Sequence, residues 1–347
     1  MTTARVRAFD WLRGIAVVVM IQTHALVLLL PGLRRGDFFV ALQWIDGLVA
    51  PSFILAAGFS MALTQVRAAA SAGTAPGARG KRLRRTLRRI GEVLLVATLV
   101  NWMWFPIFRE PRWIFRIDIL QCIGLSLLIA LPFLFTLATR PQVLRLAALA
   151  LAALAFGISP LAEHVGPPLA TFVNGTTGAV FPLLPWSGYV YLGAAIGTSA
   201  AIGGPRATAL SLAGLAALGL LLWWLTPQVA ALYPPHEFWV TDPANHARRW
   251  TQVALFALLL LGLERLRPGP LLPLRFLEVF GTSSLAGYFL HQMLLFFRIG
   301  GFSFQAVWGD RLSWARFWPV LALLIASTFV LTLVVDAAYR RADARLR

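Results

Sequence analysis

Long apolar runs separated by short polar connections dominate this chain. A run of about 17–25 apolar residues is long enough to cross the hydrocarbon core of a bilayer as a helix. The polar connections reach only about twenty residues, so we predict one all-α domain over residues 1–347, a polytopic membrane bundle. The criterion gives ten membrane-spanning helices, at residues 13–31, 47–66, 90–108, 117–138, 144–160, 180–202, 207–226, 249–266, 279–299 and 316–338.

Composition supports a membrane protein and excludes a soluble domain. Hydrophobic residues make up 59% of the chain, and the mean hydropathy is +0.73. The net charge of +17 comes from residues near the ends of the predicted spans, so we predict no nucleic-acid partner. The single cysteine, Cys122, falls inside a predicted span and can form no intrachain disulfide.

The distribution of arginine and lysine predicts the orientation. Positive charge gathers on the cytoplasmic side of membrane proteins. It is densest in residues 67–89, which we therefore expect to form a flexible basic cytoplasmic loop. An even number of spans then places both termini in the cytoplasm. The segments 161–179 and 227–247 become the outer loops.

Two histidines lie deep within predicted spans. His24 is in the middle of the first span and His291 is in the ninth, at a similar depth on a helix of the same direction. Ionisable groups at membrane depth usually face a protein interior or a wet cavity. The pair therefore suggests a shared site in which His24 acts as a general acid or base. The alternative is that the two are unrelated core histidines, each hydrogen-bonded to a neighbouring helix. We predict no metal, because no further ligand motif accompanies the pair.

Several charged residues flank the spans. Asp10 and Arg13 are three residues apart at a helix start, where they act as a cap and an anchor, or as part of a site. Asp46 precedes the second span, as a cap or as a group that orients a histidine. Arg116, near Asp118 and Gln121 at the start of the fourth span, lies close to the membrane core.

The basic segment, the tryptophans and the loop histidines allow more than one interpretation. Arginines between 79 and 89 hold phosphates, bind anionic lipid or only set topology. Tryptophans near span ends, Trp186 among them, are typical of the interfacial belt. We expect the outer-loop histidines to be solvated and uninformative; they are His164, His236 and His246.

A series of motifs resembles one known family. The chain opens with Asp10-x-x-Arg13-Gly14-Ile15-Ala16, followed by Asp46-Gly47-Leu48-Val49-Ala50-Pro51-Ser52-Phe53 and Gly58. It continues with Arg116-Ile117-x-x-Leu120-Gln121-x-x-Gly124, Phe181-Pro182-Leu183-x-Pro185-Trp186-x-Gly188-Tyr189-x-x-Leu192-Gly193 and Phe280-Gly281-x-Ser283-Ser284-Leu285-x-x-Tyr288-x-x-His291. In this order the motifs resemble bacterial members of the heparan-alpha-glucosaminide N-acetyltransferase catalytic-domain family. The opening is also similar to the wider acyltransferase-3-like group.

The resemblance implies a transmembrane acyltransferase in the bacterial inner membrane. Such enzymes take an acyl group, most often acetyl, from cytoplasmic acyl-CoA and deliver it to a sugar on the other side of the membrane. The chain departs from the lysosomal enzyme, which has asparagine at the place of His24 and its proposed catalytic histidine in the first outer loop. That loop has no histidine here, whereas the acyltransferase-3-like pattern places one inside the first span, as His24 is.

Together these observations lead to a specific hypothesis and one rival. The catalytic residues would be His24 with Asp10 and Asp46. The substrate and acyl-CoA contacts would be Arg13, His291, Arg116, Gln121, Arg85, Arg88, Arg89 and Trp186. The partners are acyl-CoA, a glycan or other cell-envelope sugar and the bilayer; a homodimer is left open. The rival is a transporter or flippase of a small anion or lipid-linked sugar, in which buried His and Arg relay protons and clamp substrate.

Overall fold

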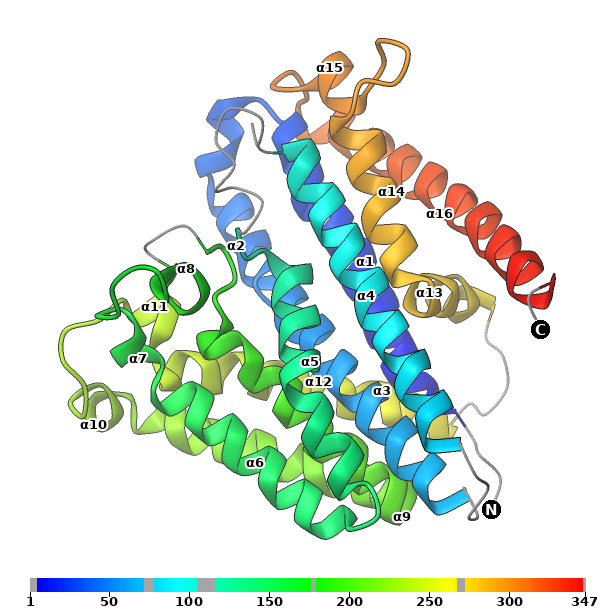
Figure 1. The fold of residues 1–347 in the computed structure, drawn as a ribbon. Coiled ribbons are helices and arrows are strands. Elements are labelled where there is room, and N and C mark those ends of the chain that lie inside the picture. Colours follow the sequence, from blue (N-terminus) through cyan, green and yellow to red (C-terminus); the bar gives the residue numbers. More distant parts are fainter. Residues whose placement is uncertain (1–4, 72–77, 105–115, 176–178, 267–271, 346–347) are drawn as a thin grey trace. The chain divides into compact units, whose positions relative to one another are not determined.

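The fold is helical throughout the part of the chain that the computed structural model describes, residues 5–71, 78–104, 116–175, 179–266 and 272–345 (Figure 1). Those residues contain two isolated β-bridges and no strand. The short helices are η1 (Leu26–Leu28), η2 (Pro31–Arg35), α2 (Asp37–Asp46), α7 (Ser159–Ala162), α8 (Ala170–Val173), α10 (Thr226–Ala230), α11 (Phe238–Thr241), α13 (Leu272–Thr282), α14 (Ser284–Phe296) and α15 (Phe304–Trp308). The long helices are α1 (Arg7–Ala25), α3 (Val49–Ser71), α4 (Ala78–Trp104), α5 (Ile119–Leu137), α6 (Pro141–Gly157), α9 (Leu183–Trp224), α12 (Pro243–Leu266) and α16 (Trp314–Arg345).

Each predicted span falls largely on a helix, which confirms the all-α membrane class. Among the described residues, five helical segments are long and apolar enough to cross a bilayer. They are Arg7–Leu28, Asp37–Ser71, Ile119–Leu137, Leu183–Trp224 and Trp314–Arg341. The other predicted spans fall on helices that are shorter or carry charged ends, such as α4 and α12. The count of ten spans therefore stays a prediction.

Helix α9 covers two predicted spans and is broken between them. Gly204 has φ 61° and ψ −149°, a conformation that side chains with a Cβ rarely adopt. Pro205 follows and cannot donate a backbone hydrogen bond to the preceding turn. The break lies in the gap that the sequence predicts between residues 202 and 207.

The predicted flexible loop at 67–89 is largely helical instead. Helix α3 continues to Ser71, and α4 begins at Ala78. Arginines 79–89 therefore occupy the first three turns of α4. Residues 72–77 of the predicted loop lie outside the described residues.

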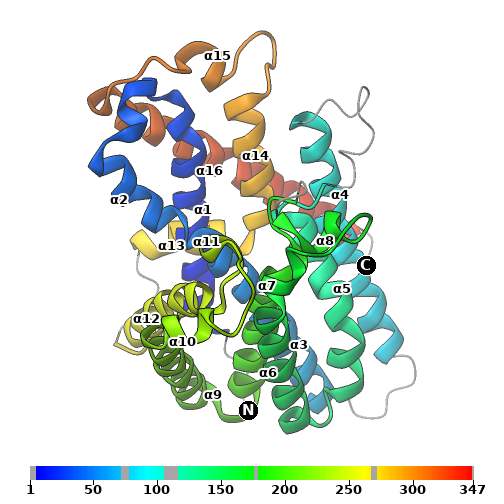
Figure 2. The same cartoon turned by 90° about the vertical axis from the view of Figure 1, so that its left-hand side faces the viewer.

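The chain forms two compact units, and the first consists of residues 1–50 and 262–347. Here α1 packs on α13 so closely that backbones touch. A Cβ on Gly14 would lie 2.0 Å from the Leu277 carbonyl oxygen, and one on Gly281 would lie 1.9 Å from the Asp10 carbonyl oxygen. Helix α14 packs on α16, and α15 lies at one end of α14 (Figures 1 and 2).

The second unit consists of residues 51–261. Helix α6 packs along α9, and α4 packs along α5 (Figure 2). Helix α3 meets the first half of α9 through Gly58, Gly193 and Gly197. At each of these glycines a Cβ would lie 1.9–2.3 Å from a backbone oxygen of the facing helix. Small residues that allow such close approach are typical of helix pairs in membranes.

Candidate functional site

The first unit brings the two predicted histidines together. Nδ1 of His24 on α1 lies 2.8 Å from Nε2 of His291 on α14, and the imidazole rings are nearly parallel, 5.1 Å apart. The amide nitrogen of Gln292 lies 2.9 Å from Nδ1 of His24 and 3.1 Å from Nε2 of His291. The prediction of a shared site for the two histidines therefore agrees with this geometry.

The hydrogen bonds of His291 bear on the position of the proton on His24. Nδ1 of His291 lies 3.0 Å from the Gly287 carbonyl oxygen, so it carries a hydrogen and donates. In the neutral ring, Nε2 of His291 is then an acceptor. It can accept from Nδ1 of His24 or from the Gln292 amide nitrogen, and when Nδ1 of His24 is the donor, the lone pair of His24 is on Nε2. That nitrogen bonds no described residue, and the His24 side chain is only partly buried. In that arrangement a basic nitrogen is held in place and accessible.

Asp46 lies beside the same turn of α1. Its carboxylate is close to Gln22 and Thr23, the two residues before His24, and accepts a hydrogen bond from Gln43 at 3.2 Å. Its second oxygen, Oδ1, is buried without a hydrogen-bond partner among the described residues. No hydrogen bond joins Asp46 to His24. This carboxylate can therefore act on the site electrostatically, as a buried negative charge near the histidine turn.

Asp10 holds arginines and does not reach the histidine. Its two carboxylate oxygens accept from Arg5 and from Arg13, the latter at 2.9 Å. Asp10 precedes His24 by fourteen residues, which corresponds to about 21 Å along a helix. The geometry therefore gives Asp10 the role of holding Arg13.

Arg116 and Gln121 lie in the second unit, at the start of α5. Asp118 and Gln121 form a capping box, in which Asp118 Oδ1 accepts from the Ile119 amide and Gln121 Oε1 accepts from the Asp118 amide. The Arg116 carbonyl oxygen accepts a hydrogen bond from Asn101 at 2.9 Å. These contacts give Gln121 and the Arg116 backbone a structural role, which the spacing Asp118-x-x-Gln121 could have indicated.

The arginines of α4 separate into two groups. Arg85 and Arg89 line a cavity of about 250 Å³ between α3 and α4, and Arg82 joins them there. Arg88 does not line it, and its Nε donates to Glu92 at 3.0 Å. Arg82 was not singled out from the sequence, because nothing in a run of arginines indicates which side chains face the neighbouring helix.

Trp186 belongs to a buried aromatic cluster and not to a surface belt. Its ring lies 5.5 Å from that of His246 and 5.7 Å from that of Tyr189. His246 is fully buried, contrary to the expectation of a solvated loop histidine. It accepts from the Tyr189 hydroxyl at 2.9 Å and donates to the Val240 carbonyl. Both ring nitrogens are satisfied, so His246 has a packing role.

His236 is tied into the predicted outer loop. Its ring nitrogens donate to the Pro234 carbonyl oxygen at 2.8 Å and to Asp242 at 2.9 Å. Burial acts to lower the pKa of His236, but these two hydrogen bonds and the nearby carboxylates outweigh it and raise that pKa. This expected solvated histidine is instead a structural ion pair.

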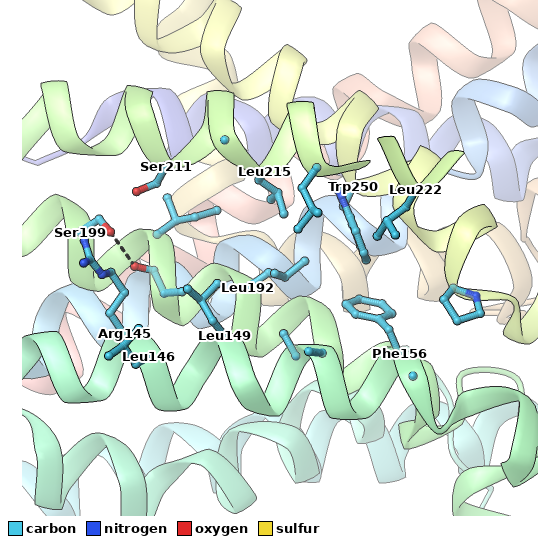
Figure 3. Close-up of a pocket in the computed structure, with 18 residues that line it drawn as sticks. Arg145, Leu146, Leu149, Phe156, Leu192, Ser199, Ser211, Leu215, Leu222 and Trp250 are labelled. Atoms are coloured by element: carbon cyan, nitrogen blue, oxygen red, sulfur yellow. Dashed lines mark hydrogen bonds between the residues drawn. The ribbon is translucent and has the colours of Figure 1, made fainter. Parts of the chain in front are cut away.

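A larger, mainly apolar cavity lies in the second unit between α6 and both halves of α9. Its volume is about 640 Å³. Figure 3 shows Arg145 and Ser199 at one end and Phe156, Leu222 and Trp250 at the other. None of the residues predicted for catalysis or acyl-CoA binding lines it.

Comparison with known protein families gives one match. The family described as heparan-alpha-glucosaminide N-acetyltransferase, catalytic, matches residues 5–237. The match covers two thirds of the chain and includes His24 and Asp46, whereas His291 lies beyond it. No curated protein matches this chain.

Proposed function

The chain belongs to the heparan-alpha-glucosaminide N-acetyltransferase catalytic family, and on that premise we propose that it transfers an acyl group from cytoplasmic acyl-CoA to a sugar on the outer side of the membrane. The family makes it a membrane acetyltransferase. Acetyl is therefore the acyl group we expect, and a sugar hydroxyl or amine is the acceptor. The inner membrane of a bacterium would be its location.

One observation carries the catalytic part of the proposal, the pairing of His24 with His291. With Nδ1 of His24 donating to His291, Nε2 is the nitrogen that can take a proton. A general base must come within hydrogen-bond reach of the proton it removes. Nε2 is partly accessible and bonds no described residue, so an acceptor hydroxyl or amine can reach it.

In the proposed reaction, this nitrogen acts first as a base and then as an acid. His24 Nε2 removes the proton from the acceptor as its oxygen or nitrogen bonds to the thioester carbon. The carbon–sulfur bond then breaks, and the CoA thiolate takes the proton from His24 to leave as a thiol. Asp46 stabilises the imidazolium that exists between the two steps. An acyl-histidine route would use the same nitrogen as a nucleophile.

The His24→Ala variant tests this assignment. We expect the turnover of acetyl-CoA with a panel of sugar amines and hydroxyls to fall about 10²–10⁴-fold, the usual contribution of a general base. The measurement is release of the CoA thiol by the protein in liposomes. Acetyl-CoA should still raise the melting temperature of the variant, because a ligand that binds only the folded state stabilises it.

His164→Ala is the matched control, since this histidine is exposed in the predicted outer loop. Wild-type turnover in His24→Ala would contradict the base assignment. Substrate counterflow in liposomes without CoA would contradict acyl transfer and favour the transporter.

A further inference from the structure

The cavity between α3 and α4, here called the arginine pocket, is lined by three guanidinium groups from one helix face. Arg82, Arg85 and Arg89 follow a spacing of three and four residues, which places them on the same side of α4. The pocket also presents the polar side chains of Thr64, Gln65 and Thr86. No acidic residue is among its lining residues, so it concentrates positive charge.

Arg82 is incompletely satisfied within the pocket. Its Nε and Nη1 atoms are buried and have no hydrogen-bond partner among the residues that the structure describes. A buried charged donor without an acceptor is costly. Around it the polar groups are fixed: Gln65 donates to Thr86 Oγ1 at 3.0 Å, and Thr64 donates to the Ser60 carbonyl at 2.7 Å. An anion would supply what the guanidinium lacks.

Topology alone does not account for this arrangement. A positive charge that only sets orientation needs to lie near the membrane surface, and any exposed position on α4 serves. Arg84, Arg85, Arg88 and Arg89 are all exposed and serve that purpose equally, but Arg85 and Arg89 also line the pocket. They do so together with Arg82, which is only partly exposed, so three arginines converge on one cavity.

We propose that the arginine pocket binds a phosphate group carried by a larger molecule. Guanidinium forks match the oxygens of phosphate, and several of them suit a doubly charged group. The volume of about 250 Å³ leaves room for part of the attached molecule. Two sources fit this chemistry on the predicted cytoplasmic side. One is a phosphate of acyl-CoA, which rests on the proposed function, and the other is the headgroup of an anionic phospholipid.

Binding to Arg82→Gln and Arg84→Gln of the full chain tests the proposal. Both variants lose one positive charge on the same helix, so long-range attraction changes equally. We expect Arg82→Gln to weaken binding at least tenfold, the loss that removal of hydrogen bonds to a charged group gives. Arg84→Gln should change it less than twofold. Arg82→Lys, which keeps the charge but loses the fork, should lie between them.

Three probes distinguish the sources of the phosphate. They are CoA, adenosine 3′,5′-bisphosphate and phosphatidylglycerol, the last in nanodiscs with phosphatidylcholine as the reference. Selective loss of CoA and bisphosphate binding in Arg82→Gln would assign the pocket to CoA. Selective loss of phosphatidylglycerol binding would assign it to lipid. Equal binding of all three probes by Arg82→Gln and Arg84→Gln, both with wild-type melting temperatures, would overturn the proposal.

Failure of the phosphate site and failure of acyl transfer are separable. Phosphate binding should be unchanged in His24→Ala, since that histidine belongs to the other unit. Conversely, if His24→Ala had no effect on turnover, Arg82→Gln would still weaken phosphate binding.

Discussion

At the scale of single residues, the base proposed here depends on a neighbour's hydrogen bond. On its own the neutral His24 ring would populate both tautomers, because the hydrogen bond made by one ring nitrogen decides which nitrogen carries the proton. The Gly287 carbonyl orients His291, and His291 in turn orients His24. His291 is thus a positioning residue whose effect is transmitted through Nδ1 of His24.

Substitution of His291 should reveal that dependence. His291→Ala removes the acceptor for His24 Nδ1–H, so both tautomers become available and turnover should fall, by roughly tenfold or more. His291→Gln retains an amide oxygen that can accept and should recover part of the rate. The diagnostic measurement is kcat and KM for acetyl-CoA in both variants.

The expected loss lies in kcat, with KM nearly unchanged. If His291 had a purely structural role, both substitutions would lower the melting temperature equally, and His291→Gln would have no higher kcat than His291→Ala. Equal kcat in His291→Ala and His291→Gln would therefore contradict a role in proton placement.

Two members of the cluster formed by His24, His291 and Gln292 were predicted from their depth in the membrane alone. His24 and His291 were expected to share a site because they lie at one level on helices of one direction. Gln292 was missed, although a glutamine next to a histidine in an apolar span is a visible signal. Arg82 could not be distinguished from Arg84 or Arg88, because facing a neighbouring helix is a property of packing.

At the scale of helices, the contact of α3 with α9 depends on glycines, which have no side chain to hold the two backbones apart. Gly193 has the Leu55 carbonyl oxygen 1.9 Å from where its Cβ would lie. Backbone atoms cannot move aside as a flexible side chain does. Any residue larger than glycine must therefore separate the two helices.

Gly193→Ala should accordingly destabilise the protein, by about 1–3 kcal/mol as for other overpacked contacts. The melting temperature in detergent measures this. Gly214→Ala, on the same helix α9, is the matched control, because no atom lies within 4 Å of its would-be Cβ.

Alanine at position 214 should be neutral or slightly stabilising, since glycine weakens a helix interior by about 0.5–1 kcal/mol. A Gly193→Ala variant as stable as Gly214→Ala would show that the two helices do not touch as described.

Helix positions were more predictable than helix ends. Apolar length located every long helix, and the break at Gly204 coincides with a predicted gap. The start of α4 was placed too late, because the arginines that follow Ala78 lower the hydrophobic signal on which the prediction depended. A helix that extends beyond the membrane has no reason to be apolar there.

At the scale of the whole molecule, the proposed reaction requires a defined orientation. Acyl-CoA is cytoplasmic and the sugar acceptor is outside, so the basic start of α4 and the loop before α12 must face opposite compartments. Positive charge predicts this arrangement.

Cysteine labelling can establish on which side of the membrane each of these two segments lies. Cys122 is the only cysteine and is buried, so Cys122→Ala gives a background without reactive thiols. In that background Leu232→Cys, at a position 77% exposed, should react with a membrane-impermeant maleimide in intact spheroplasts. Arg84→Cys should react only after permeabilisation. Labelling of both positions from the same side would contradict the predicted orientation.

Tertiary organisation was the least predictable level. Hydropathy gives the order of the helices, but it does not indicate which of them pack together. The single domain stays a prediction, and nothing in the sequence indicated that the first 50 residues cluster with residues 262–347 while the intervening chain forms its own compact unit. Contacts such as that of Gly14 with Leu277 depend on local shape, which a single sequence does not display.

This arrangement of the first unit has a consequence during synthesis. His24 emerges from the ribosome early, and its partner His291 follows 267 residues later. At about 5–20 residues per second, that interval takes roughly 13–50 s. Helix α1 must wait in the membrane without α13 and α14 for almost the whole time of translation. A truncated or half-made chain would thus contain the proposed base but not the group that orients it, so we expect activity to begin only when the protein is nearly complete.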